Sequence, residues 1–312
     1  MGKTAIEWTA TVGPDGTTYP GFTFNPWEGC SKVSNGCANC YAETRAKRFE
    51  SVVWGPNGTR RVKAESGWKE PLKWEREAIA TGVRRRVFCA SLADVFEDWK
   101  KPMSAADGDV LHVCNECRAW RTMAKMCHGP LAHMPLTMDD VRSRLFALID
   151  DTPNLDWLLL TKRPENALRM AYDAWCKRVP GHVSQNEGDG RRWAFPPNVW
   201  FGTSCENQAT ADERIPHLLR VPAAVRFLSM EPLLGAVDLT RWIGPRRECE
   251  FFNAKPTPQR LSEGVINCER YENSSGACKA GFCPLGLIGG ISWVIVGGET
   301  LHGEQPREGG VS

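Results

Sequence analysis

The sequence predicts an α/β protein built on a parallel sheet that is either open or barrel-like. Six short apolar runs are bounded by turn residues, as expected of strands. They lie at residues 22–25, 87–91, 157–161, 199–203, 225–229 and 293–297. Most of them are continuously apolar rather than alternating, which is typical of strands that are buried on both faces of a parallel sheet.

Helix-like segments fall between the strand-like runs. They cover residues 41–50, 68–80, 138–150, 163–178 and 207–219. The third segment opens with Asp139 and Asp140, which suit a helix N-terminus because carboxylates interact favourably with the helix dipole. Strand and helix therefore alternate about six times, which is the pattern of a parallel α/β sheet.

Three stretches interrupt this alternation because they are polar, rich in Gly and Pro, or rich in Cys. They cover about residues 100–137, 180–196 and 244–290. We expect a single α/β domain over residues 1–312, with these stretches as insertions.

Composition narrows the class of protein. The net charge of +2 gives no bulk signal for nucleic-acid binding, although 39 Lys and Arg residues allow a local basic face. No apolar run approaches the ~20 residues that span a membrane, and the first residues lack a signal-peptide core. We therefore expect a cytoplasmic protein without a membrane partner.

Thirteen cysteines, an odd number, then indicate metal binding rather than a disulfide framework.

The first cysteine group comprises Cys30, Cys37 and Cys40, with the spacing Cys-x6-Cys-x2-Cys. It follows the first predicted strand and precedes a predicted helix. Three thiolates can hold three irons of a [4Fe–4S] cluster and leave the fourth iron open for another ligand. A zinc site would normally require a fourth nearby ligand, and residues 20–60 contain no histidine. The alternative is a zinc knuckle whose fourth ligand comes from elsewhere in the chain.

Several blocks of sequence resemble a known family. They are NPWEGC at 25–30, GCANCYA at 36–42, LTKRP at 160–164, SMEPLLG at 229–235 and GGE at 297–299. On these blocks the chain is similar to the phage-type "three-Cys-motif" proteins, which are radical-SAM-like (SAM is S-adenosylmethionine). The resemblance implies a partial (β/α)6 radical-SAM-like barrel, related to the TIM barrel, with Cys-rich insertions and an iron–sulfur cluster at its mouth. If the chain is phage-encoded, the host cytoplasm is its expected location.

The resemblance also implies a chemistry. SAM would bind the open iron through its amino and carboxylate groups, and an external electron donor would supply the electron that cleaves it. The products would be methionine and a 5′-deoxyadenosyl radical, which abstracts a hydrogen atom from the substrate.

Every predicted strand ends in a polar residue or a glycine, and the sites of parallel α/β proteins lie at these carboxyl ends. The candidates for SAM binding are Tyr41, Ser91, Asp94, Lys162, Thr203, Glu206, Ser229 and Glu231. Ser91 and Asp94 would face the amino group. Lys162 or Arg163 would pair with the carboxylate, and the later strand ends would bind the ribose. The alternative for each is an ordinary helix cap or a surface salt bridge. No residue is singled out as catalytic.

A second group reads Cys114-x2-Cys117 and then Cys127-His128, which is a zinc pattern. His112 and His133 are rival ligands. A structural zinc ion would explain how a polar insertion with little core stays folded. A third group could bind a second zinc ion or an auxiliary cluster, or could be unpaired thiols. It consists of Cys249, Cys268, Cys278 and Cys283.

The leading hypothesis is a radical SAM enzyme with a large substrate, such as a (hyper)modified thymine base in phage DNA that is isomerised. A second hypothesis is a lyase that repairs thymine photoproducts. A third is a zinc-stabilised nucleic-acid-binding protein without turnover. Trp120, between Arg118 and Arg121, could stack on bases beside phosphates, or could simply be a packed Trp on a solvated surface.

Overall fold

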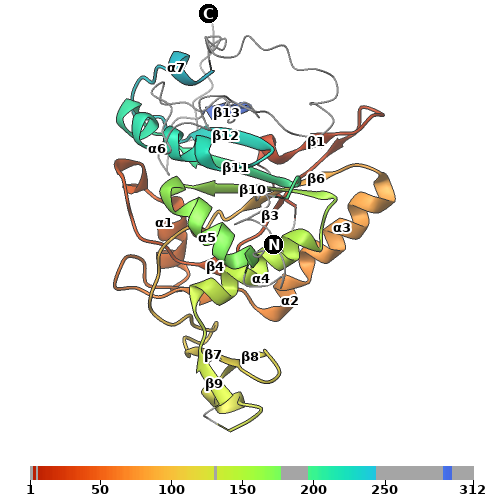
Figure 1. Cartoon of the computed structure of the whole chain (residues 1–312), viewed down its shortest axis with the longest axis vertical. Helices are drawn as coiled ribbons and strands as arrows, with labels where there is room; N and C mark the ends of the chain where they lie inside the picture. The colour runs from red at the N-terminus through yellow and green to blue at the C-terminus, as the bar shows by residue number, and fades with distance from the viewer. Residues whose placement is uncertain (1–2, 5, 130–131, 177–195, 244–290, 297–312) are drawn as a thin grey trace, which may run out of the picture.

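A six-stranded parallel sheet, curled into a half-barrel, forms the centre of the molecule in the computed structural model (Figure 1). The structure describes residues 3–4, 6–129, 132–176, 196–243 and 291–296. The strands lie side by side in chain order, which is the order of a (β/α) half-barrel. They are β3 (Phe22–Thr23), β6 (Arg85–Cys89), β10 (Leu155–Thr161), β11 (Val199–Ser204), β12 (Val225–Met230) and β13 (Trp293–Val296). The predicted α/β class and the six predicted parallel strands are confirmed.

Helices follow the strands and cover the outer face of the sheet, with α4 packed on α5 and α5 on α6. The longer helices are α1 (Tyr41–Arg48), α3 (Glu70–Thr81), α4 (Met138–Asp150), α5 (Pro164–Cys176) and α6 (Gln208–Arg220). Short helices are α2 (Glu65–Trp68), α7 (Thr240–Ile243) and the 3-10 turns η1 (Glu7–Thr9), η2 (Asn35–Cys37) and η3 (Met123–Lys125). The N-terminus of α4 is fixed by a reciprocal capping box between Thr137 and Asp140, and both predicted acids, Asp139 and Asp140, lie in the first turn.

The two faces of the sheet carry different apolar layers, because side chains alternate along a strand. On β10, Leu155, Trp157 and Leu159 are buried in the main core against the helices. Leu158, with Leu160 partly buried beside it, belongs to a second cluster on the inner face. Burial on both faces explains why this strand reads as one continuous apolar run.

Aromatic side chains pack together on the inner face of the sheet, below the last residues of the strands. Trp8 packs edge-on against Phe88 at 4.8 Å and against Trp293 at 6.0 Å, and Trp293 contacts Trp200 at 6.1 Å, all between ring centroids. Phe227 joins this aromatic floor, 5.9 Å from Trp293. The floor leaves the carboxyl ends of the strands as the open end of the half-barrel.

Residues 105–129 and 132–135 form an arm that projects from the half-barrel (Figure 1). Its small antiparallel sheet has the order β8-β7-β9, with β7 (Leu111–Cys114), β8 (Trp120–Thr122) and β9 (His133–Pro135). Backbone hydrogen bonds at its base join Met103 to Leu136 and to Leu111, each at 2.9 Å. The arm is thus an insertion with its own secondary structure, within the predicted insertion at 100–137.

Trp120 fastens the arm to the barrel. The guanidinium of Arg144 in α4 lies over the Trp120 ring at 4.6 Å and over the Trp68 ring at 4.4 Å, and the two Trp rings pack edge-on. The carboxylate of Glu65 accepts hydrogen bonds from both terminal nitrogens of Arg144. Of the two interpretations of Trp120, the structure supports the packed one.

Two antiparallel strand pairs complete the described sheets, β1 (Thr11–Val12) with β2 (Thr18–Tyr19), and β4 (Trp27–Glu28) with β5 (Arg61–Val62). Within the described ranges, no helix is both long and apolar enough to cross a membrane. The predicted insertions at 180–196 and 244–290 lie outside the described residues, apart from residue 196.

Candidate functional site

The first cysteine group lies on the loop that connects β4 to α1, at the open end of the half-barrel. Cys37 ends the 3-10 turn η2, and Cys40 is the N-cap residue of α1. All three thiols are free and half-buried. The N-terminus of α1 follows Cys40, and its positive end favours negative charge on the loop.

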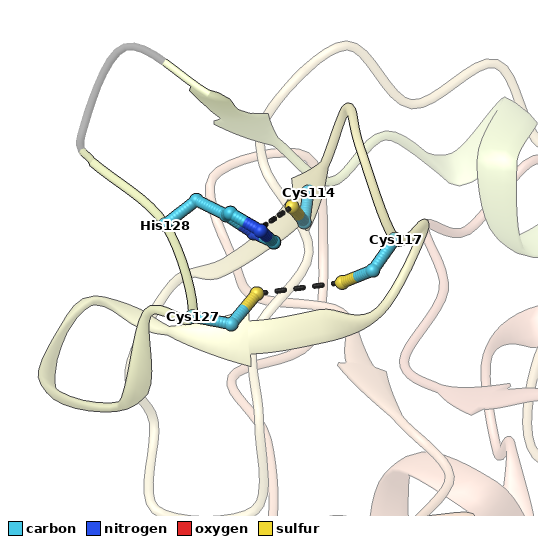
Figure 2. A group of neighbouring side chains, drawn as sticks. All are labelled: Cys114, Cys117, Cys127 and His128. Carbon is cyan, nitrogen blue, oxygen red and sulfur yellow. Dashed lines mark hydrogen bonds between the residues drawn. The ribbon is translucent and has the colours of Figure 1, made fainter.

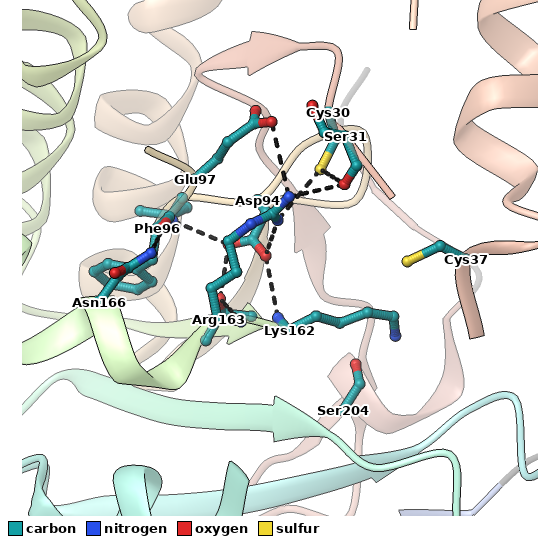
Figure 3. Close-up of polar contacts among 12 residues, drawn as sticks. Cys30, Ser31, Cys37, Asp94, Phe96, Glu97, Lys162, Arg163, Asn166 and Ser204 are labelled. Atoms are coloured by element: carbon teal, nitrogen blue, oxygen red, sulfur yellow. Dashed lines mark hydrogen bonds and ion pairs between the residues drawn. The ribbon is translucent and has the colours of Figure 1, made fainter. Parts of the chain in front are cut away.

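Arg163 connects this loop to the strand ends (Figure 3). Its Nη1 lies 3.5 Å from the Sγ of Cys30 and 2.8 Å from a carboxylate oxygen of Asp94. Its Nη2 donates to the carbonyl of Ser31 at 2.8 Å. Burial disfavours the charged guanidinium, but the charges of Asp94, Cys30 and Glu97 raise the pKa of Arg163 overall. The cation is therefore held permanently beside Cys30.

The Cys30 thiol is half-buried beside the Arg163 guanidinium. Burial raises its pKa to about 12, although the neighbouring Arg163 charge opposes this shift. Any metal that binds Cys30 as a thiolate therefore has to displace this proton.

Asp94 organises the end of β10. Its carboxylate accepts from the hydroxyl of Thr161 at 2.7 Å, from the backbone N–H of Lys162 at 3.1 Å and from Arg163. The side chain is buried, so this candidate for SAM binding already has protein partners for both oxygens.

A second buried ion pair, Arg60 with Glu97, lies next to the Arg163–Asp94 pair. Arg60 donates to both oxygens of Glu97 at 2.7 Å, lies over the Trp99 ring at 3.9 Å, and bonds the Ser31 hydroxyl at 2.8 Å. Glu97 also lies 3.8 Å from Arg163. Arg60 and Glu97 were not identified from the sequence, since they are 37 positions apart and carry no local motif.

Glu206 braces the other side of the cysteine loop. Its carboxylate accepts from the Ser34 hydroxyl at 2.7 Å and pairs with Lys162 at 3.3 Å and Arg214 at 3.0 Å. Burial raises the pKa of Glu206, but Lys162, Ser34 and Arg214 outweigh it and lower the value overall. A Cβ at Gly36 would clash with this carboxylate, so the loop needs glycine there.

Tyr41 and Ser91 lie on the side of the loop near β6. The hydroxyl of Tyr41 donates to the backbone carbonyl of Ser91 at 2.5 Å, and the Ser91 hydroxyl contacts Asn25 at 3.1 Å. Burial raises the pKa of Tyr41. The structure thus brings the end of β6 and the start of α1 together.

The remaining strand-end candidates differ in their exposure to the open end. Alternation along the strands puts Lys162, Ser204 and Ser229 on the inner face above the aromatic floor, and Ser204 pairs with Ser229 in register. Figure 3 shows Lys162, Ser204 and Cys37 around one space. Thr203 points to the outer face and donates to the carbonyl of Thr161 at 2.9 Å. Glu231, just after β12, is half-buried.

A cavity of about 290 Å³ opens beside this network. Charged side chains of both signs line it, among them Glu97, Lys162, Arg163 and Arg214, together with Ser31 of the cysteine loop. The cavity borders the cysteine loop and is polar, so it suits a charged small molecule better than an apolar one.

The second cysteine group converges at the arm (Figure 2). Ligand atoms of Cys114, Cys117, Cys127 and His128 all lie within 4.8 Å of one another, so this group could hold a metal ion. Cys114 Sγ is 3.3 Å from His128 Nδ1, and Cys117 Sγ is 3.4 Å from Cys127 Sγ. The N–H of Cys117 lowers the pKa of Cys114 to about 6, against the opposing effect of burial. The four residues grouped from the sequence are those that the fold assembles.

The third cysteine group (Cys249, Cys268, Cys278 and Cys283) lies outside the described residues, as does the GGE block at 297–299. The functional residues that the sequence did not reveal are Ser31, Ser34, Gly36, Arg60, Glu97, Ser204 and Arg214. Of these, only Ser31, Ser34 and Gly36 could have been indicated, by their position between Cys30 and Cys37.

The fold and the sites define an α/β half-barrel protein with a three-cysteine loop at its open end and a separate Cys/His group that could hold a metal ion. The chain belongs to the family described as "Protein of unknown function (DUF5131)", which matches residues 3–127 and 120–309. No curated protein and no solved structure shows significant similarity to the chain.

Proposed function

We propose that this protein is a radical SAM enzyme whose [4Fe–4S] cluster is held by Cys30, Cys37 and Cys40. The observation that carries the proposal is the position of the loop. Three free, half-buried thiols stand at the open end of a parallel half-barrel whose inner face, below that end, is filled by aromatic side chains. Sites of parallel barrels lie at this end.

The donor set of the loop fits such a cluster. Three cysteines on one loop leave one iron without a protein thiolate, whereas a set of four would close the cluster. Arg163 and the N-terminus of α1 supply positive charge beside the thiolates, which favours a centre of net negative charge. When bound, the cluster would supply the electron that cleaves SAM.

The buried network of ion pairs and hydrogen bonds positions the cysteine loop. Arg163 fixes Cys30 and Ser31 against the end of β10, and Glu206 fixes Ser34 against Lys162 and Arg214. Both anchors restrain the cysteine loop from the side of the sheet. Asp94, Glu206 and Thr203 already have protein partners, so we assign them this positioning role rather than direct contact with SAM.

Contact with SAM then falls to side chains nearer the open end. Lys162 is half-buried and pairs with Glu206 at 3.3 Å, and the remaining N–H groups of its ammonium would pair with the SAM carboxylate. Ser91, Ser229 and Glu231 offer oxygens for the amino group and the ribose hydroxyls, and Tyr41 orients Ser91. Ser204 joins this set because it lies beside Ser229 on the inner face.

The test is anaerobic purification followed by incubation with SAM and dithionite. We expect about four irons and four sulfides per chain and the formation of 5′-deoxyadenosine. Replacement of Cys30, Cys37 and Cys40 by Ala should abolish both. Cys205→Ala is the matched control, because Cys205 is a buried thiol on the same sheet, and it should retain both. Iron that persists in the triple variant would show that the site is elsewhere.

We propose a base in DNA as the substrate, a modified thymine in phage DNA being the specific candidate. Incubation with phage DNA and nucleoside mass spectrometry separates a rearranged base from a cleaved photoproduct. Unchanged nucleosides in several such DNAs would contradict both versions.

The Cys/His group supports a second candidate, a zinc-stabilised nucleic-acid-binding protein without turnover. A colourless protein that holds zinc but no iron would favour that candidate. In either case we propose that the metal of the arm is zinc.

A further inference from the structure

The arm has too little apolar core to stay folded on packing alone. Among its described residues, the buried side chains are those of Val113, Cys114, Thr122 and His133. Only Val113 is an ordinary hydrophobic residue. Small modules with so little buried apolar surface usually need a disulfide or a metal to be stable.

We infer that a structural Zn²⁺ ion, bound by Cys114, Cys117, Cys127 and His128 Nδ1, is the core of the arm, and that Glu116 orients the histidine ligand. The inference deepens the metal assignment made above. It does not depend on the radical chemistry, because its test measures zinc at the arm and not iron at Cys30.

Two of the distances between ligand atoms are close to those around a tetrahedral ion, and all the ligand atoms lie within 4.8 Å of one another. Zn–S bonds of about 2.3 Å and Zn–N bonds of about 2.0–2.1 Å give ligand separations of roughly 3.5–3.8 Å. The distance from Cys117 Sγ to Cys127 Sγ is 3.4 Å, and the distance from Cys114 Sγ to His128 Nδ1 is 3.3 Å. A Cys117–Cys127 disulfide would need about 2.0 Å between its sulfurs, so the two thiols are in ligand-like rather than bonded contact.

The turn between the first two ligands has a geometry that aims both sulfurs at one point. The N–H of Arg118 donates to the carbonyl of Cys114 at 2.9 Å, and the N–H of Cys114 donates to the carbonyl of Ala119 at 3.0 Å. Arg118 adopts φ 59°, a left-handed conformation that is uncommon for a residue with a side chain. Such a conformation persists only where the surroundings enforce it, and a metal clamp on Cys114 and Cys117 would do so.

His128 is oriented as zinc ligands usually are. Its Nδ1 faces Cys114, while its Nε2 lies 3.1 Å from the carboxylate of Glu116. Metal-bound histidines almost always donate their other ring N–H to such an acceptor, which fixes the ring and raises the basicity of the ligand nitrogen.

His133 has a different position. Its Nδ1 contacts the carbonyl of Gly129 at 3.2 Å and its Nε2 lies 3.7 Å from Cys127 Sγ. It is not one of the four residues whose ligand atoms lie mutually close. We assign it a positioning role toward Cys127, and it becomes the natural control for His128.

The test is zinc content and zinc K-edge X-ray absorption on the full-length protein. We expect one zinc per chain, with three sulfur and one nitrogen neighbour at the distances above, and no iron in the zinc shell. His133→Ala should keep this shell, and His128→Ala should lose its nitrogen. Glu116→Gln should weaken zinc binding about tenfold in a chelator competition. Cys205→Ala should match the wild-type protein.

Four outcomes would overturn the inference. They are a protein without zinc, a Cys117–Cys127 disulfide in the mass spectrum under non-reducing conditions, a shell of four sulfurs, and a nitrogen lost from His133→Ala but not from His128→Ala. Iron at the first cysteine group is counted in the same samples. Zinc without iron would support this inference and contradict the proposed enzyme, and iron without zinc would do the reverse.

Discussion

The Nη1 of Arg163 lies 3.5 Å from the Sγ of Cys30, although the two residues are 133 positions apart in the chain. The same nitrogen bonds Asp94 at 2.8 Å. One guanidinium thus joins the cysteine loop to the ends of β6 and β10. The cysteines are therefore held by the barrel and do not stand on an independent loop.

Arg163→Ala should destabilise the protein and reduce the iron it retains. The change leaves Asp94 and part of Glu97 without their buried counter-charge, which typically costs about 3–5 kcal/mol. Arg163→Lys should recover part of this loss, because Lys keeps the charge but lacks the planar fork whose two nitrogens bond Asp94 and Ser31 separately. Urea unfolding and iron content measure both effects. Arg169→Ala, an exposed Arg in the helix α5 that follows Arg163, is the control, and an equal effect there would contradict the role of Arg163.

Glu206→Gln should destabilise the protein at neutral pH and less so in acid. The folded-state pKa of Glu206 is below its ordinary value of 4.5, so its carboxylate contributes stability above pH 4.5 and loses it as the pH falls through the lowered value. Removal of the charge leaves Lys162 and Arg214 partly unpaired, which we expect to cost about 3 kcal/mol near neutrality.

Urea unfolding across this pH range checks the sign. The difference between wild type and Glu206→Gln should shrink below pH 4.5. Glu213→Gln, an exposed change in the helix α6 that follows Glu206, should show little difference at any pH. A stability difference between wild type and Glu206→Gln that grows in acid would contradict this role of the Glu206 carboxylate.

Gly36→Ala should disturb the cysteine loop more than a matched glycine change. A Cβ at residue 36 would clash with the Glu206 carboxylate, and such overpacking costs about 1–3 kcal/mol. At Gly235 the nearest atom to an added Cβ is 3.7 Å away, on Asn207, so Gly235→Ala is the control. Iron occupancy should fall in the first variant and not in the second. Equal occupancy in both would show that the loop does not depend on Glu206.

Trp120→Ala should loosen the arm without removing its metal. The change deletes one ring of the Trp68–Arg144–Trp120 stack, worth about 1–2 kcal/mol, while the four metal ligands remain. Limited proteolysis should cut the chain faster near residues 105–135, with zinc content unchanged. Met134→Ala, an exposed change in β9, should resemble wild type. Loss of zinc from Trp120→Ala would mean that docking and metal binding are one unit.

The sheet could be predicted from the sequence because its strands are buried on both faces. Leu158 and Leu159 point to opposite apolar layers, so β10 shows an uninterrupted apolar run with no competing helical period. The second cysteine group could be predicted equally well, since all four members lie within 15 consecutive residues and a local turn brings them together.

The network behind the cysteine loop could not be predicted in the same way. Arg60 and Glu97 look like surface charges until the fold buries them against Trp99. Asp94, Thr203 and Glu206 were recognised as strand-end polar residues, but their partners come from distant segments, so spacing alone could not separate positioning residues from ligand-facing ones.

Electron paramagnetic resonance of the dithionite-reduced protein, with and without SAM labelled with ¹⁵N in its amino group, tests the central claim most directly. We predict the signal of a reduced [4Fe–4S] cluster that changes when SAM is added and acquires a ¹⁵N coupling, and that is absent from Cys37→Ala. A protein without that signal, or one whose signal is the same with and without SAM, would contradict a cluster with an open iron on Cys30, Cys37 and Cys40.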